Sequence, residues 1–99
     1  MKKKSKKIYI GGALYHVRTQ KKVERPSGMP KDVYILGQFR PLTHEIIYMD
    51  KLRESKNLTI IHELIHAIQH EYSLDFNEGI VDVLSRELTG SLCQLGILS

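Results

Sequence analysis

The chain has 99 residues, of which 41% are hydrophobic and 26% charged, and its formal net charge is +4. These values are typical of one soluble globular domain with a single core. One cysteine, Cys93, excludes an internal disulfide, and its apolar neighbours Leu92 and Leu95 predict a thiol packed in the core. The apolar stretch over 8–15 is too short for a secretory signal or a membrane span, so we expect a cytoplasmic protein without membrane contact.

The positive charge is concentrated at the start of the chain. Five of the first seven residues are lysine, namely Lys2, Lys3, Lys4, Lys6 and Lys7. We expect residues 1–7 to form a solvated, disordered tail ahead of a single domain over 8–99. The alternative is weak, nonspecific contact between these lysines and the phosphates of a nucleic acid.

The first half of the chain has the composition of β-strands. β-Branched and aromatic residues over 7–10 and 13–19 flank Gly11-Gly12, which predicts a two-residue hairpin. A loop over 21–30 precedes two further predicted strands, over 32–39 and 45–49. The preference of aromatic residues for strands explains three tyrosines here: Tyr15, Tyr34 and Tyr48. The expected result is a mainly antiparallel sheet of three to four strands.

The second half changes to helical periodicity. One helix begins between Asp50 and Asn57 and ends near Tyr72, and a second runs from about Asn77 to Leu95. Apolar residues share one face of the second helix and predict its core stripe: Ile80, Val81, Leu84, Leu88, Leu92 and Leu95. Strands followed by helices predict an α+β domain in which two helices cover one face of the sheet.

The central motif is His62-Glu63-Leu64-Ile65-His66, an HExxH sequence. Residues four apart on a helix lie one above the other, so both imidazoles can bind one metal ion. Glu63 lies about 100° around the helix from His62, where it can accept a proton from the attacking water. The spacing predicts one Zn²⁺ site with His62 and His66 as ligands and Glu63 as the catalytic general base.

The remainder of this helix favours a metal site over a solvated polar stripe. Apolar residues occupy most of its circumference, and the polar ones share the remaining arc: Thr59, His62, Glu63, His66 and His70. A helix with so broad an apolar surface is expected to be buried, and buried imidazoles and carboxylates need partners.

A catalytic zinc site generally has three protein ligands, so a third ligand is needed. The candidates are Glu78, His70, Asp75 and His44. His70 lies two turns from His62, whereas Glu78 begins the next helix and returns toward the histidines if the two helices pack antiparallel. The alternative for Glu78 is a capping box with Asp75 as the N-cap, because the D-x-x-E spacing fits.

The two motif-bearing segments resemble the signature helices of gluzincin metallopeptidases, in which HExxH is followed by NExxSD. The second segment here is Asn77-Glu78-Gly79-Ile80-Val81-Asp82. The resemblance implies that Glu78 binds zinc and that Asp82 orients the first histidine from the second coordination shell. Val81 stands where the family has serine, and the loop between the helices is shorter than in large gluzincins.

From Asp32 to Leu95 the chain is similar to compact minigluzincins and to ImmA/IrrE-type metallopeptidases, which bacteriophages and mobile elements often carry. The resemblance implies a zinc-dependent endopeptidase acting on peptide or protein substrates. It also implies that the strand over 45–49 is an edge strand along the cleft, to which a peptide adds as a further strand.

A peptidase also needs a donor for the oxyanion formed at the attacked carbonyl. Tyr72, His70 and His44 are candidates, and the sequence does not choose among them. The rival hypothesis from another class is a non-catalytic protein whose zinc stabilises the fold and whose surface binds a partner or nucleic acid.

Overall fold

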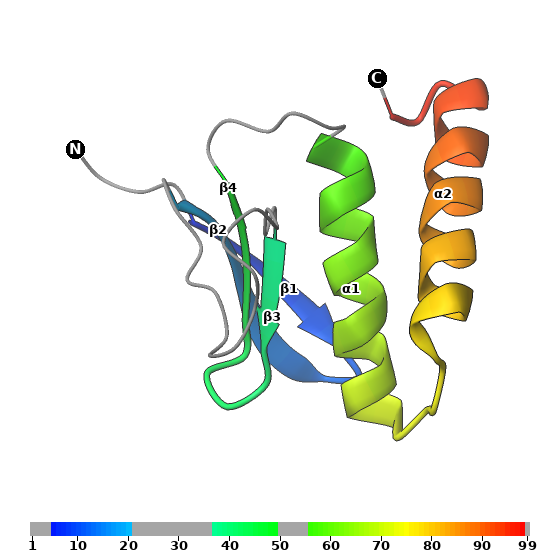
Figure 1. Cartoon of the computed structure of the whole chain (residues 1–99). Helices are drawn as coiled ribbons and strands as arrows, with labels where there is room; N and C mark the ends of the chain where they lie inside the picture. Colours follow the sequence, from blue (N-terminus) through cyan, green and yellow to red (C-terminus); the bar gives the residue numbers. More distant parts are fainter. Residues whose placement is uncertain (1–4, 21–36, 50–55, 99) are drawn as a thin grey trace, which may run out of the picture.

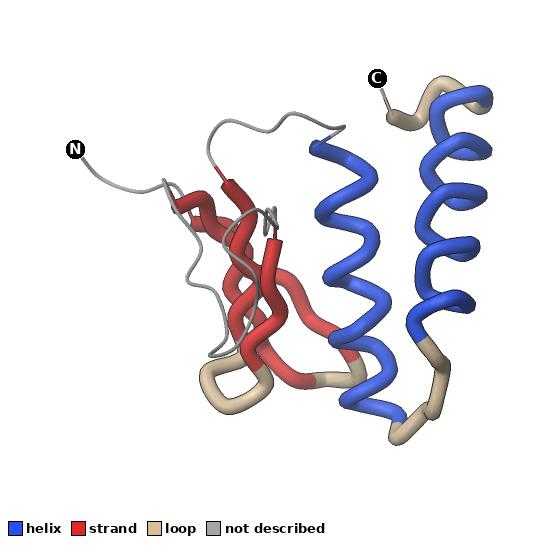
Figure 2. The backbone as a smooth tube through the Cα atoms, in the orientation of Figure 1, coloured by secondary structure: helices blue, strands red, loops and turns tan. Residues whose placement is uncertain are grey.

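The computed structural model describes residues 5–20, 37–49 and 56–98 (Figure 1). Within them four strands precede two helices: β1 (Ser5–Ile10), β2 (Ala13–Gln20), β3 (Gly37–Arg40), β4 (Glu45–Met49), α1 (Lys56–Tyr72) and α2 (Glu78–Gln94). This order confirms the predicted α+β class, with the sheet and the helices segregated in space (Figure 2).

The four strands form one mixed sheet in the order β1-β2-β4-β3. β1 pairs with β2 and β3 pairs with β4 as antiparallel neighbours, whereas β2 and β4 run parallel. Gly11 and Gly12 join β1 to β2 with φ of 57° and 83°. Both angles are positive, as the tightest hairpin turns require, so the predicted hairpin is confirmed.

Two expectations about the strands need correction. β4 over 45–49 lies between β2 and β3, so it is an internal strand, and among the described strands the edges of the sheet are β1 and β3. β1 begins at Ser5, so the strand takes in Ser5, Lys6 and Lys7, which the sequence assigned to the tail. Residues 1–4, the loop over 21–30 and Tyr34 lie outside the described residues.

The core lies between the sheet and α1. Tyr15 of β2, Ile46 of β4 and Ala67 of α1 are fully buried there, because alternate strand residues point toward one face and α1 presents small and apolar residues to it. α1 packs against the sheet, and α2 packs against the outer side of α1 (Figure 1). Two helices are present as predicted, but they form two successive layers.

α2 is rotated about its axis relative to the orientation that the predicted core stripe implies. The buried residues are Val81 and Ser85, whereas Ile80, Leu88 and Leu95 are 43%, 45% and 71% exposed. Ser85 fits the interface because its hydroxyl donates to the Val81 carbonyl one turn earlier at 2.7 Å. Of the predicted stripe, Val81 is buried and Leu84 and Leu92 are half-buried, so the prediction is confirmed in part.

The same rotation explains Cys93, which is exposed on α2, so its predicted packing in the core is wrong. Neither described helix is long and apolar enough to cross a membrane.

Candidate metal centre

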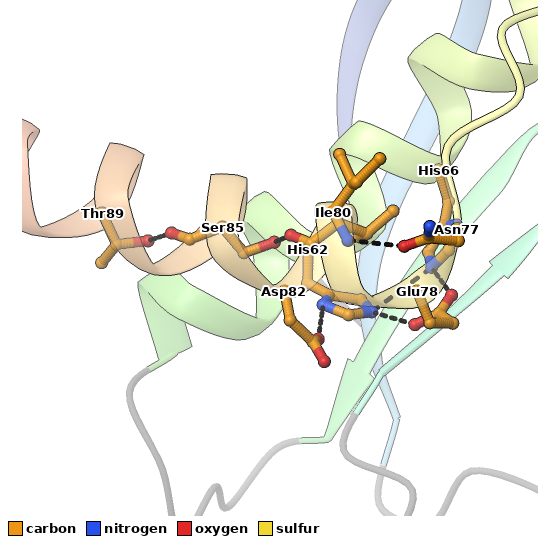
Figure 3. A network of polar contacts seen from close by, with 9 residues as sticks. His62, His66, Asn77, Glu78, Ile80, Asp82, Ser85 and Thr89 are labelled. Atoms are coloured by element: carbon orange, nitrogen blue, oxygen red, sulfur yellow. Dashed lines mark hydrogen bonds and ion pairs between the residues drawn. The ribbon is translucent and has the colours of Figure 1, made fainter.

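The HExxH motif lies in the middle of α1, where both histidines turn toward α2. Their Nε2 atoms are 3.3 Å apart, and the two rings meet edge to face (Figure 3). Two neutral imidazoles with facing lone pairs repel each other unless a proton or a cation lies between them. Burial lowers the pKa of the His66 imidazole, against an upward influence of Glu78, and so favours the neutral ring that a metal ligand requires.

Glu78, the first residue of α2, completes a three-donor group. Its carboxylate oxygens lie 3.0 Å from His66 Nε2 and 3.5 Å from His62 Nε2. Donors bound to tetrahedral zinc at 2.0–2.1 Å are about 3.3 Å from one another, so the three side chains fit this ion. The Glu78 side chain is 67% exposed, which leaves an open side at which water or a ligand could complete the coordination.

Asp82 supports this group from behind His62. Its Oδ1 lies 3.4 Å from His62 Nδ1, on the opposite side of the ring from the Nε2 atom that faces Glu78 (Figure 3). A carboxylate at this nitrogen favours a proton on Nδ1 and leaves the Nε2 lone pair for a metal. Glu78 and Asp82 are one turn apart on α2, so a single helix supplies the third donor and the orienting group.

The start of α2 shows why Glu78 is available. The N-cap is Asn77, whose side-chain oxygen accepts the Ile80 N–H at 2.9 Å. Asp75 is therefore not the cap, and the alternative in which Glu78 belongs to a capping box with it is wrong. Asp75 lies in the exposed connection before Asn77, while the Glu78 carboxylate points at the two histidines.

Replacing these carboxylates should reduce zinc affinity to different extents. Glu78→Ala removes a donor and should have the largest effect, whereas Asp82→Ala leaves all three donors and should weaken binding about 10–100-fold. Equilibrium dialysis with metal analysis measures both changes. Asp75→Ala is the matched control, since it removes a nearby carboxylate outside the group. Equal affinities for all three variants would contradict the assignment.

Glu63 lies on the other flank of the motif, between α1 and β3. Burial raises the pKa of its carboxyl to about 7, the negative charge of Glu78 adds to this increase, and a hydrogen bond from the Phe39 backbone N–H opposes it. A carboxyl with a pKa near neutrality can both accept and return a proton, as a general base that later acts as an acid must do.

Gly37 on β3 is a site residue that the sequence analysis did not identify. A Cβ atom there would lie 2.8 Å from Thr59 Cγ2 and 3.2 Å from Glu63 Cγ. β3 therefore passes so close to α1 that only glycine fits. The sequence contains a signal for this, because an isolated glycine inside a strand pattern often marks a close backbone approach.

Gly37→Ala should destabilise the fold by about 1–3 kcal/mol, because Thr59 is buried and cannot withdraw freely from the added methyl group. Urea unfolding measures the loss as a lower midpoint with an unchanged slope. Gly90→Ala is the control, since a Cβ at this helical position meets nothing within 4 Å. That control should gain up to about 1 kcal/mol. A Gly37→Ala variant as stable as the parent would show that the close approach is absent.

The other sequence-predicted residues lie elsewhere. His44 and His70 group with Glu71, separately from the donors His62, His66 and Glu78. The Tyr72 ring lies against the β1–β2 turn, within 3.4 Å of the Cβ position of Gly11. The first donor group therefore contains none of the other three candidate ligands, His44, His70 and Asp75. Which residue donates to the oxyanion stays a prediction.

Comparison of this chain with family models, with curated proteins and with solved structures finds no match.

Proposed function

We propose that the protein is a zinc-dependent metallopeptidase of the gluzincin type. The observation that carries the proposal is the donor group of His62, His66 and Glu78, whose facing atoms are 3.0–3.5 Å apart, with Glu63 beside it. An imidazole pair with one carboxylate and an open side matches the ligand set of a catalytic site and not that of a closed structural one.

Each residue has a separate task in peptide hydrolysis. His62, His66 and Glu78 hold the cation, and Asp82 keeps the His62 ring in the orientation and tautomer that binding requires. When bound, zinc supplies the Lewis acidity that activates water and polarises the scissile carbonyl. Glu63 accepts the proton of the attacking water and then donates it to the leaving amine.

The rotation of α2 also supports this assignment. Turning Glu78 and Asp82 toward the histidines places Val81 and Ser85 against α1 and leaves Leu88 exposed. A helix positioned only by its core would bury its leucines first. Departures from the apolar pattern are expected where a functional site sets the geometry.

Among the described strands, β3 lies at an edge of the sheet, where an extended peptide could pair. Phe39 on β3 directs its backbone N–H to Glu63, hence away from β4. Because backbone groups alternate in direction along a strand, Gly37 also directs its N–H and C=O toward this edge. A substrate that pairs with β3 would run beside Glu63. The proposal therefore assigns to β3 the strand-addition role that the sequence analysis gave to residues 45–49.

Zinc-dependent hydrolysis tests the function directly. The untagged chain loaded with zinc is incubated with an unfolded protein substrate, and the products are identified by mass spectrometry. Cleavage is expected, and it should stop in chelator and in His62→Ala. His16→Ala is the matched control, because His16 on β2 belongs to neither histidine group. Tight zinc binding without cleavage of any peptide would instead favour the non-catalytic rival.

A further inference from the structure

A second group of metal-binding side chains lies further along α1. His70 and Glu71 come from the last turn of α1, and His44 comes from the turn between β3 and β4. One donor atom from each lies within 4.8 Å of the others, and His44 Nε2 is 3.8 Å from Glu71 Oε2. None of these three residues belongs to the first donor group, and His44 and His70 enter the peptidase proposal only as candidate oxyanion donors.

The orientation of His44 is fixed by two neighbours. Its Nδ1 lies 3.3 Å from the Leu14 carbonyl, to which a protonated Nδ1 can donate, and its ring stacks on Tyr15 at 4.5 Å between centroids. A proton on Nδ1 leaves a lone pair on Nε2, the atom that faces Glu71. A backbone carbonyl behind the ring is the same kind of support that Asp82 gives to His62.

His44 also has a φ of 52°, a left-handed conformation that non-glycine residues seldom adopt. This conformation costs conformational free energy, and such positions concentrate at ligand sites. The strained turn places the imidazole over the end of α1, where His70 lies 6.4 Å away between ring centroids.

Glu71 is fixed in turn by Tyr15. The fully buried tyrosine hydroxyl donates a 2.5 Å hydrogen bond to Glu71 Oε2. This bond holds the carboxylate on the His44 side of α1. Only His70 is exposed in the group, and its ring contacts Phe39 edge to face at 5.6 Å. Two donors are therefore preoriented by their surroundings, and the third is free to adjust.

We propose that His44, His70 and Glu71 form a second binding site for a divalent transition-metal ion, of the zinc class. Two imidazoles and one carboxylate are suitable donors for Zn²⁺, Co²⁺ and Ni²⁺, whereas Ca²⁺ and Mg²⁺ prefer oxygen. The donors must approach from within 4.8 Å to about 3.3 Å to bind tetrahedral zinc, so this site should be weaker than the first. A bound ion would link the end of α1 to the β3–β4 turn.

The test counts metal ions in the full-length, untagged chain after it has been stripped with chelator. Equilibrium dialysis against Zn²⁺, and separately against Co²⁺, should give two equivalents per chain, the second weaker than the first. His44→Asn and His70→Gln should each retain only the first. Asparagine is chosen at position 44 because it tolerates a positive φ. His16→Ala, the matched histidine control, should still bind two.

Two results would overturn the proposal. One is a wild-type chain that saturates at a single equivalent, which would leave the group as a polar contact between His44 and Glu71. The other is a second equivalent that survives in His70→Gln, a variant at an exposed position that should fold even if His44→Asn does not. His66→Ala should keep the second equivalent, so this proposal and the peptidase function can fail separately.

Tyr15→Phe tests whether the buried hydroxyl positions Glu71. The variant keeps the ring stacked on His44 but removes the hydrogen bond, so the second equivalent should bind about tenfold more weakly or worse. A purely structural tyrosine would lower stability without changing this affinity relative to the first site, and that result would remove Tyr15 from the site.

Discussion

Glu63→Gln is expected to slow peptide hydrolysis by about 10²–10⁴-fold while zinc binding is retained. The amide has nearly the shape of the carboxyl but cannot take a proton from water. The three donors that could hold the ion are His62, His66 and Glu78, so Glu63 is not one of them. Loss of turnover with full metal content would therefore separate the general base from the ligands. An unchanged rate would exclude the role.

The same variant should make the metal-free protein more stable at alkaline pH. The pKa of Glu63 is about 7 in the folded chain against 4.5 for an ordinary glutamate, mainly because of its burial. The folded state therefore binds more protons than the unfolded state between these values, so the wild type loses stability as pH rises through this interval. The loss from this one group is about 2–3 kcal/mol between pH 5 and pH 8. Glutamine carries no charge at any pH and should not contribute this loss.

Urea unfolding in chelator at pH 5 and pH 8 measures the difference. The stability gained by Glu63→Gln should be larger at pH 8, because the wild-type carboxylate is then ionised in a buried position. Glu87→Gln, on the exposed outer side of α2, is the matched control and should show no such dependence on pH. If the free energy of unfolding changed equally for the wild type and Glu63→Gln between pH 5 and pH 8, burial would not raise the pKa of Glu63.

Local patterns predicted the elements of this fold well. The paired glycines of the β1–β2 turn, the β-branched and aromatic residues over 45–49 and the helical spacing of the two histidines are each local features of the sequence. The strand order β1-β2-β4-β3 is not determined by neighbouring residues, because the parallel pairing of β2 with β4 joins segments far apart in the chain. The sequence therefore predicted a sheet of three to four strands, whereas the family resemblance placed an edge of the sheet at residues 45–49, which form an internal strand.

The candidate site divides in the same way. His62 and His66 are fixed by one helix, and Glu78 follows once the two helices pack antiparallel, as they do (Figure 1). The close contact at Gly37 and the hydrogen bond between Tyr15 and Glu71 depend on how β3 and β2 approach α1. No local pattern in the sequence determines this approach. The predicted stripe on α2 is confirmed only in part, because apolar spacing alone does not include the polar contacts that determine the helix rotation.

Zinc should contribute unusually strongly to the stability of this chain. α2 packs mainly on α1, it buries Val81 and Ser85, and it leaves Leu88 and Leu95 exposed, so its apolar attachment is small. The donor group joins the two helices through Glu78, and an ion bound only to the folded state adds its binding free energy to the free energy of unfolding. With free zinc a thousandfold above its dissociation constant, the gain is about 4 kcal/mol.

For a domain of this size that gain corresponds to a rise in melting temperature of about 15–30 °C, which scanning calorimetry in zinc and in chelator would measure. His62→Ala should lose most of the increase, whereas His16→Ala should keep it. Hydrogen exchange locates the effect, because the amides of α2 should lose more protection in chelator than those of β2 and β4. Equal melting temperatures with and without zinc would mean that no ion joins the helices, since a ligand that binds only the folded state must stabilise it.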